Sequence, residues 1–316
     1  MIRLFFAAFL LLSATGEAAD FEVIDVAGVA REGEGAAPIP VALFLPASLD
    51  PEDGPYPLFL FSHGFGGSGG SYRYLTDRLA DAGWIVAAPD HADTVSVHRL
   101  REGEKTVGGL RLAIEAKRLI DGEFDFDAHA YRLDETDSVL SALVEHERLG
   151  PLIDRDRIAM GGHSFGGYTT LGVAGAVEGR QNSARAKAVV LLSPGLWMFT
   201  DDDFARVDVP VLYMLGEREL HIGRGDGTKH DLARRAIDAL DASETLSLAL
   251  SLDGGQHLSF SDRAKKMIGK RRREKADADL SAIAEVVAAF LEEHVGGNEA
   301  GSAAKSAERS GRFEGL

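Results

Sequence analysis

The chain has 316 residues, of which 45% are hydrophobic and 27% are charged, a composition typical of a globular protein long enough to bury a large core. Its formal net charge of −16 argues against nucleic-acid binding, because the phosphate groups would be repelled. The sequence contains no cysteine, which excludes disulfides, thiolate nucleophiles, zinc ribbons and iron–sulfur clusters.

Residues 1–19 have the layout of a secretory signal peptide. Arg3 supplies a positive charge, Leu4 to Leu12 form an apolar run, and small residues follow up to Ala19. The apolar run is shorter than the roughly 20 residues that a membrane span needs. We therefore expect cleavage near Asp20 and a periplasmic or secreted protein, the alternative being an uncleaved anchor or a buried helix.

Strand and helix patterns alternate from Phe21 to Val295. Continuous apolar runs such as Tyr56–Ser62 are typical of strands covered on both faces, whereas Leu75 and Leu79 have the spacing of an amphipathic helix. The first two expected strands, 21–30 and 39–45, are predicted to form an antiparallel edge pair. Further strands are expected at 56–62, 84–88, 157–162, 188–192, 211–215 and 246–252, and helices at 71–82, 134–149, 166–177, 230–240 and 280–291.

Two regions depart from this alternation. Residues 91–133 carry glycines and many charges and are predicted to form an insertion over the strand ends, partly helical near 110–120. Residues 297–316, rich in Gly, Ser, Ala and charge, are predicted to be a disordered tail. The remainder of 20–296 is expected to form one α/β domain, with a mostly parallel central sheet and helices on both faces. Ligands bind such sheets at the carboxyl ends of the strands.

A candidate nucleophile lies where a predicted strand meets a helix. Gly162-His163-Ser164-Phe165-Gly166 matches G-x-S-x-G, the pattern of a nucleophile elbow, a sharp turn that exposes a serine. Glycines on either side of the serine remove side chains that would collide in such a turn. The alternative is a glycine-rich turn with an incidental serine, but the strand-to-helix context favours a nucleophile.

The loop after strand 56–62 has the composition of an oxyanion hole, which needs backbone amides with no side chain in front of them. It reads His63-Gly64-Phe65-Gly66-Gly67, and we expect the amides of Phe65 and Phe165 to be the donors. His63 is expected to be structural. The sequence has no G-x-x-x-x-G-K-[ST] motif and no G-x-G-x-x-G that opens a helix, so we do not expect nucleotide binding.

The base and acid of such a site follow the serine in the order acid, then histidine. His257 lies in a loop just after strand 246–252, whereas His294 lies on the last predicted helix, so His257 is the expected base. The acid should follow strand 211–215. Glu219 is preferred for its spacing after Gly216, with Glu217 as the alternative acid and Asp226 a weaker candidate.

These motifs, together with Ala88-Pro89-Asp90-His91 and the Gly167-Tyr168-Thr169-Thr170 that follows the elbow, resemble the α/β-hydrolase superfamily. The similarity, from about Ala42 to Phe260, is to the predicted dienelactone hydrolase and platelet-activating factor acetylhydrolase-like group, which is related to secreted polyester hydrolases. The resemblance implies a triad of Ser164, Glu219 and His257.

The resemblance also implies an apolar substrate pocket, because Ser193-Pro194-Gly195-Leu196-Trp197 is similar to the stretch that lines it in these families. Trp197 and Phe199 are the expected pocket residues. Two features differ from the family pattern. The acid is usually aspartate rather than the glutamate found at Glu219, and true dienelactone hydrolases use a cysteine that this chain lacks.

The expected activity is therefore hydrolysis of carboxylic esters through an acyl-enzyme, acting on small-molecule or lipid esters without a metal or organic cofactor. A peptidase or acyltransferase on the same triad is one alternative, and a non-catalytic binding protein of the same fold is another. His91 and Asp93 are considered as metal ligands, although no second ligand cluster accompanies them. The basic residues of 265–273 suggest at most peripheral membrane contact, but such a run more often forms a solvated helix.

Overall fold

The structure, a computed structural model, describes residues 21–29, 36–94, 119, 124–180, 182–219, 229–262, 270–298 and 300–316. The predicted signal peptide, most of the predicted insertion 91–133, Asp226 and residues 265–269 of the basic cluster lie outside these ranges. Among the helices that are described, none has both the length and the apolar character needed to cross a membrane.

Within the described residues, the strands form one 9-stranded sheet in the order β1-β2-β4-β3-β5-β6-β7-β8-β9. The neighbours from β4 to β8 pair in parallel, whereas β1, β2 and β9 add antiparallel edges. The strands are β1 (Glu22–Val26), β2 (Ile39–Phe44), β3 (Tyr56–Ser62), β4 (Ile85–Pro89), β5 (Ile153–His163), β6 (Val189–Leu192), β7 (Val211–Gly216), β8 (Leu246–Leu252) and β9 (Phe313–Gly315). The predicted mostly parallel sheet and its antiparallel first pair are confirmed.

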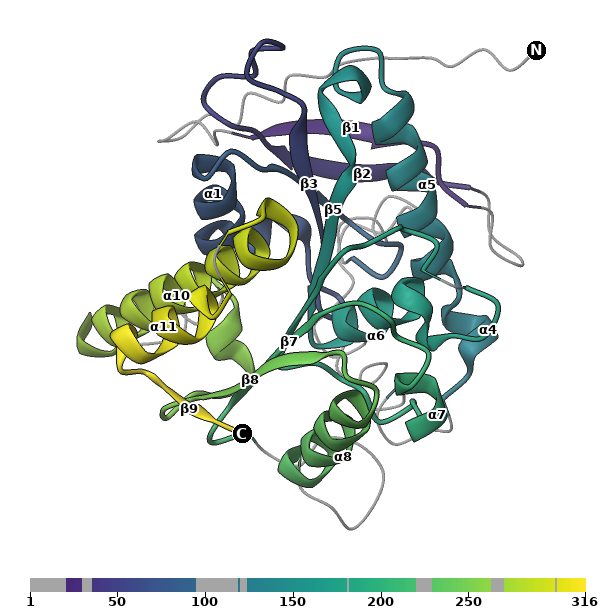
Figure 1. Cartoon of the computed structure of the whole chain (residues 1–316). Coiled ribbons are helices and arrows are strands. Elements are labelled where there is room, and N and C mark those ends of the chain that lie inside the picture. Colours follow the sequence, from purple (N-terminus) through teal and green to yellow (C-terminus); the bar gives the residue numbers. More distant parts are fainter. Residues whose placement is uncertain are drawn as a thin grey trace.

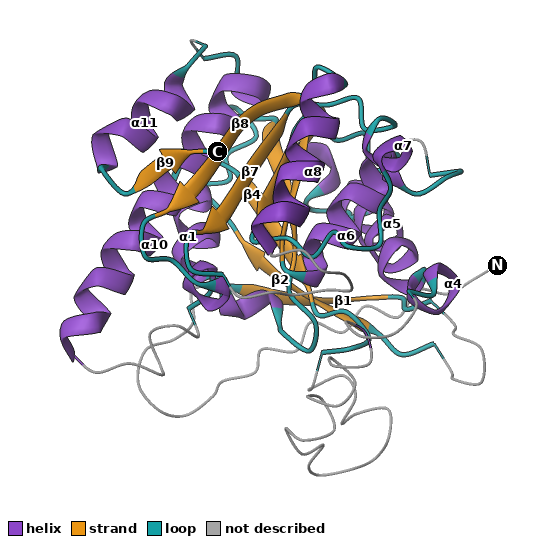
Figure 2. Ribbon diagram, turned by 90° about the horizontal axis from the view of Figure 1, so that it is seen from below, coloured by secondary structure: helices purple, strands orange, loops and turns teal. Residues whose placement is uncertain are grey.

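Helices cover both faces of the sheet (Figures 1 and 2). On one face lie α1, α10 and α11, and on the other α5, α6 and α8, with α4 and α7 beyond them. Their bounds are α1 (Arg73–Asp81), α4 (Phe126–His129), α5 (Tyr131–Glu145), α6 (Phe165–Leu171), α7 (Asp201–Phe204), α8 (Lys229–Ala242), α10 (Lys270–Leu291) and α11 (Ser302–Ser310).

The central strands are apolar on both faces because each face meets helices. In β3, Leu58 and Leu60 belong to the core under α5 and α6, whereas Phe59 and Phe61 belong to the core under α1 and α10. Side chains alternate between the two sides of a strand, so one continuous apolar run supplies both cores.

The C-terminal segment differs from its prediction as a disordered tail. Residues 302–310 form α11, whose Ala303 and Ala307 are buried in the core that includes α10. Phe313 then pairs with Leu252, so that β9 extends the sheet beside β8. The alanines that suggested a disordered tail are four residues apart on one helix face, where small side chains allow α11 to pack closely on its neighbour.

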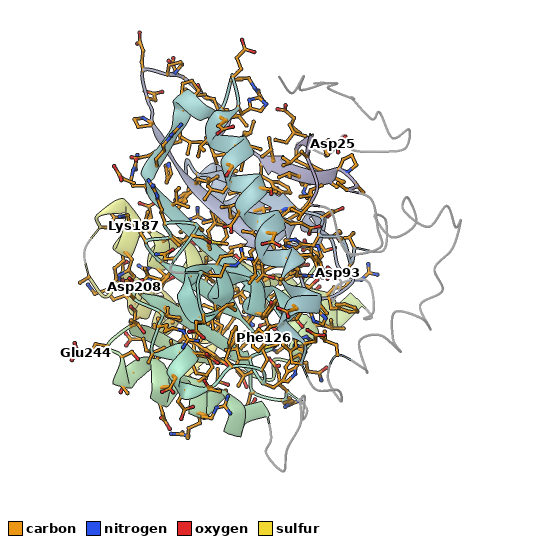
Figure 3. The ribbon with its side chains drawn as sticks, turned by 90° about the vertical axis from the view of Figure 1, so that its right-hand side faces the viewer. Asp25, Asp93, Phe126, Lys187, Asp208 and Glu244 are labelled. Atoms are coloured by element: carbon orange, nitrogen blue, oxygen red, sulfur yellow. The ribbon has the colours of Figure 1, made fainter. Side chains whose placement is uncertain are left out.

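The loops that follow the parallel strands all lie at the carboxyl ends of those strands, on one side of the sheet. In Figure 3, Lys187, Asp208 and Glu244, which precede β6, β7 and β8, lie on one side of the molecule. Asp93, which follows β4, lies on the opposite side. The residues expected to form the site come from that opposite edge.

Candidate active site

Ser164 occupies the turn between β5 and α6 in a backbone conformation that is rare for a residue with a side chain. Its φ is 57° and its ψ is −119°. A Cβ atom on Gly162 would lie 2.2 Å from the carbonyl oxygen of Gly166, and one on Gly166 would lie 2.0 Å from that of Ser62. The glycines are therefore required by the close approach of three backbone segments.

The structure brings together the predicted nucleophile, base and acid. Ser164 Oγ lies 2.9 Å from His257 Nε2. His257 begins a short 3-10 helix (His257–Phe260) after β8, and Glu219 follows β7. Glu219 Oε2 is 3.5 Å from His257 Nδ1. The three side chains thus reach one point from three separate strand ends.

A fourth side chain, Ser193, lies between the histidine and the acid. Its Oγ is 2.6 Å from His257 Nδ1 and donates a hydrogen bond of 2.7 Å to Glu219 Oε2. In the sequence, Ser193 stands out only as part of a stretch similar to pocket-lining residues. Its position directly after β6, at the same sheet edge as the other three, was the available signal.

The two candidate acids have different surroundings. Glu219 is 7% exposed, and its second oxygen, Oε1, accepts a 2.7 Å hydrogen bond from the Gly216 amide. Glu217 is exposed, and its Oε2 accepts from the Gly254 amide at 2.7 Å. Glu219 is therefore the carboxylate that the structure places beside His257.

One expected oxyanion donor, Phe65, belongs to the loop after β3, and the other, Phe165, belongs to the elbow itself. A Cβ on Gly64 would lie 3.1 Å from Ser164 Cβ, so this loop packs directly on the serine. The amides of Gly64 and Gly66 are engaged, donating to Tyr72 and Asp93. By contrast, no acceptor in the described part of the chain takes a hydrogen bond from the amide of Phe65 or Phe165. Their role as oxyanion donors therefore stays a prediction.

His163, which precedes the nucleophile, links the two sides of the site. Its Nε2 is 2.8 Å from the His257 carbonyl oxygen, to which it donates, and its Nδ1 is 2.9 Å from the Tyr72 hydroxyl. The same hydroxyl accepts from the Gly64 amide at 3.1 Å. A chain of hydrogen bonds therefore runs from the loop 63–67 to the backbone of His257. In the sequence, His163 stands out only as part of the G-x-S-x-G motif.

A buried ion pair contacts the loop 63–67. Arg132, on α5, donates to both oxygens of Asp93 at 3.0 and 2.7 Å and to the His63 carbonyl oxygen at 2.7 Å. Its guanidinium also lies 4.8 Å from the centre of the Phe165 ring. Burial alone would raise the pKa of Asp93, but the adjacent Arg132 charge holds that pKa well below its usual value.

This pairing accounts for Asp93 and His91, which the sequence analysis considered as metal ligands. Asp93 is neutralised by Arg132, and His91 is hydrogen-bonded on both ring nitrogens. Among the described residues, no group of three His, Cys, Asp or Glu side chains is placed to hold a metal ion.

His91 belongs to a second serine–histidine–glutamate chain. Ser62 Oγ lies 2.8 Å from His91 Nε2, and His91 Nδ1 lies 3.0 Å from Glu135 Oε2. Ser62 is 3% exposed, and the other two are fully buried. Burial, reinforced by the Arg132 charge, holds the pKa of His91 well below its usual value. Ser62 ends β3 and has no elbow around it.

The two predicted pocket residues differ in burial. Phe199 is 1% exposed and stacks on Tyr168, with ring centres 5.9 Å apart. Tyr168 in turn stacks on Phe165, the residue after the nucleophile, at 5.1 Å. Trp197 is half-buried and its ring packs against Gly195. An aromatic cluster thus adjoins the elbow, and the pocket itself stays a prediction.

A mostly parallel sheet, helices on both faces and a serine on a strained strand-to-helix turn define the α/β-hydrolase fold. Within this class, the family model for platelet-activating factor acetylhydrolase, isoform II, matches residues 35–106 and 133–309, and the chain belongs to that family. The unmatched interval falls inside the predicted insertion 91–133.

Similar proteins include the platelet-activating factor acetylhydrolase of Bos taurus, 26% identical over 76% of this chain and 57% of the relative. That of Cavia porcellus is 24% identical over 76% of this chain and 58% of the relative. The chain therefore spans less than two thirds of the length of these relatives.

Solved structures support the fold. The apo form of Thermogutta terrifontis esterase 2 has a TM-score of 0.55 at 17% identity, covering 89% of this chain and 97% of the esterase. A dienelactone hydrolase-like promiscuous phosphotriesterase from metagenomic libraries has a TM-score of 0.58 at 16% identity, covering 87% and 99%.

Proposed function

We propose that this protein is a serine hydrolase that cleaves carboxylic ester bonds, with Ser164 as nucleophile, His257 as general base and Glu219 as the acid. The observation that carries the proposal is the 2.9 Å contact between Ser164 Oγ and His257 Nε2 on a strained strand-to-helix turn. Nucleophile, base and oxyanion donors are the parts that acyl transfer requires.

The chemistry follows from these positions. As Ser164 Oγ bonds to the ester carbonyl carbon, His257 Nε2 accepts the serine proton and the carbonyl electron pair moves onto oxygen. The Phe65 and Phe165 amides donate to that oxyanion, and loss of one such donor typically lowers kcat by about 10²–10³-fold. Collapse expels the alcohol with the proton from His257. Water then attacks the acyl-enzyme by the same steps, which releases the acid and restores Ser164.

The alternative hydrogen-bonded set of Ser62, His91 and Glu135 has comparable contacts, but its surroundings do not suit a nucleophile and its base. Its histidine is fully buried with a pKa well below the usual value, so it stays neutral and cannot readily hold the proton of a nucleophile. Ser164 is only half-buried and accessible to a substrate. These differences favour Ser164 as the nucleophile and a structural role for Ser62.

The substrate class is proposed from the relatives. The curated relatives are named for hydrolysis of an acetyl group from platelet-activating factor, and solved neighbours are named esterases. We therefore infer that small-molecule or lipid esters with a short acyl group are the substrates. The signal-peptide pattern of residues 1–19 further supports export, which N-terminal sequencing of the mature protein would test.

Hydrolysis of p-nitrophenyl esters from acetate to palmitate tests the proposal. The wild type should show an optimum at short acyl chains, and Ser164→Ala should lower kcat by up to about 10⁶-fold. Ser62→Ala is the matched control, because it removes the serine of the Ser62–His91–Glu135 hydrogen-bonded set. It should lower kcat by at most about 10-fold. A Ser164→Ala variant with wild-type turnover would refute the proposal.

A further inference from the structure

The acid and base of the proposed site are joined through a hydroxyl. His257 Nδ1 lies 3.5 Å from Glu219 Oε2, beyond the usual range of an N–H···O hydrogen bond. Ser193 Oγ lies beside this pair and contacts both atoms, 2.6 Å from the nitrogen and 2.7 Å from the carboxylate oxygen. The shortest contacts that link His257 Nδ1 to Glu219 Oε2 therefore run through the Ser193 hydroxyl.

The direction of each hydrogen bond follows from the chemistry. His257 Nε2 must be unprotonated to accept the proton of Ser164, so the proton of the neutral ring resides on Nδ1. An ionised Glu219 only accepts, so the Ser193 hydroxyl donates to Glu219 and accepts from His257 Nδ1–H. One hydroxyl thus satisfies a donor and an acceptor at once.

The backbone holds Ser193 firmly in this place. Its side chain is fully buried, and its φ of 42° is in the left-handed region that residues with side chains rarely adopt. Its amide donates to the Met214 carbonyl oxygen at 2.7 Å, which ties the turn after β6 to β7. Such strained positions tend to occur where a side chain must be aimed.

We propose that Ser193 is a positioning residue that orients His257 and transmits to it the charge of Glu219. This inference rests on the proposed function. When His257 takes the proton of Ser164, its ring becomes a cation whose Nδ1–H still donates to Ser193, and the Ser193 hydroxyl still donates to Glu219. No proton leaves Ser193, and the carboxylate stabilises the cation through the hydroxyl dipole and by direct attraction.

The first test compares Ser193→Gly and Ser193→Ala with the wild type in p-nitrophenyl acetate hydrolysis. Glycine accepts the positive φ without strain, so Ser193→Gly removes the hydroxyl and leaves the turn able to form. Each variant should lower kcat by about 10–100-fold and leave KM within about 3-fold, because the Ser193 side chain is fully buried behind His257 and Glu219. Ser261→Ala is the control, since it removes another buried hydroxyl, which donates to the Ser71 carbonyl oxygen instead.

A double-mutant cycle then separates positioning from simple structural support. If Ser193 acts by connecting Glu219 to His257, Ser193→Gly in a Glu219→Gln background should cause less than about a 3-fold further loss. Losses that multiply would overturn the proposal, as would an unchanged kcat in both single variants. Ser193→Asp places a carboxylate beside Nδ1 and should restore at least about 10-fold of the kcat lost in Glu219→Gln, because aspartate tolerates positive φ.

The outcomes distinguish this inference from the proposed function. A wild type that hydrolyses the ester while Ser164→Ala does not, together with an unaffected Ser193→Gly, would reject the role of Ser193 alone. A wild type no more active than Ser164→Ala would reject the esterase proposal and this inference with it.

Discussion

Glu219 is held at both of its oxygens. Oε1 accepts from the Gly216 amide and Oε2 from the Ser193 hydroxyl, each at 2.7 Å. The carboxylate therefore cannot turn without breaking two hydrogen bonds in a buried environment, where each unsatisfied group costs about 1–3 kcal/mol. This anchoring suits an acid whose work is to orient a histidine.

A pair of variants tests which glutamate is the acid. Glu219→Gln removes the charge beside His257 and should lower kcat by about 10³–10⁴-fold, as expected when the histidine loses its orienting carboxylate. Glu217→Gln alters an exposed side chain bonded to Gly254 and should change kcat by less than about 3-fold. Steady-state kinetics with p-nitrophenyl acetate makes the comparison. A larger loss for Glu217→Gln would reverse the assignment.

Sequence pattern could predict the positions of Ser164 and His257 because each depends on local features. The glycines around Ser164 are required by backbone contacts, so the glycine pattern in the sequence indicates the shape of the turn. Ser193 and His163 carry no such mark. A serine after a strand is common, and only the convergence of β6, β7 and β8 brings Ser193 between His257 and Glu219.

At the scale of elements, α5 supports the loops that follow two strands. Arg132 reaches from this helix to Asp93 after β4 and to the His63 carbonyl after β3. Asp93 in turn accepts from the Gly66 amide at 2.8 Å, next to the expected donor Phe65. The loop is thus held on both sides of the Phe65 amide, and Arg132 also packs on the Phe165 ring.

Replacing Arg132 tests this support. Arg132→Met leaves the Asp93 charge buried without its partner, which should lower the free energy of unfolding by about 3–5 kcal/mol. Adding Asp93→Asn should recover part of the loss, because the uncompensated charge is removed. Arg148→Met, which breaks an exposed ion pair with Glu22, is the control and should cost less than about 1 kcal/mol. Urea unfolding measures all four proteins, and equal losses for Arg132→Met and Arg148→Met would contradict the account.

The alternation of strands and helices was predictable because buried parallel strands are continuous apolar runs with a distinct appearance. The C-terminal elements were not, because the buried residues of α11 are Ala303, Ser306 and Ala307. Alanine and serine are common in disordered segments as well as in tightly packed helices. The three-residue β9 owes its conformation to pairing with β8. Both elements depend on contacts with distant parts of the chain, which their own sequences do not indicate.

At the scale of the whole molecule, buried histidines should determine how stability depends on pH. Burial, reinforced by the Arg132 charge, holds the pKa values of His63 and His91 well below the ordinary value of 6.5. Both histidines are therefore neutral in the folded protein. As the pH falls below about 6.5, the unfolded chain binds protons that the folded protein does not, and stability decreases.

The two histidines set an expected change in the free energy of unfolding with pH. Each histidine lowers the free energy of unfolding by about 1.4 kcal/mol per pH unit below its unfolded pKa, so the two together contribute about 2–3 kcal/mol between pH 6 and pH 5. His91→Asn should remove about half of this pH dependence. Comparing the wild type with the variant at the same two pH values cancels the contribution of the overall net charge, which both proteins share. Urea midpoints at the two pH values provide the measurement. Equal slopes for the variant and the wild type would show that His91 does not titrate as described.

The central claim, that Ser164 is the nucleophile, is tested most directly by labelling with a fluorophosphonate probe followed by tryptic peptide mapping. Ser164 falls in peptide 158–180, Ser62 in peptide 32–73 and Ser193 in peptide 188–206, so the three serines are distinguished by mass. We predict one adduct, on peptide 158–180, that persists in Ser62→Ala and disappears in Ser164→Ala together with ester hydrolysis. An adduct on peptide 32–73, or hydrolysis that survives in Ser164→Ala, would contradict the account.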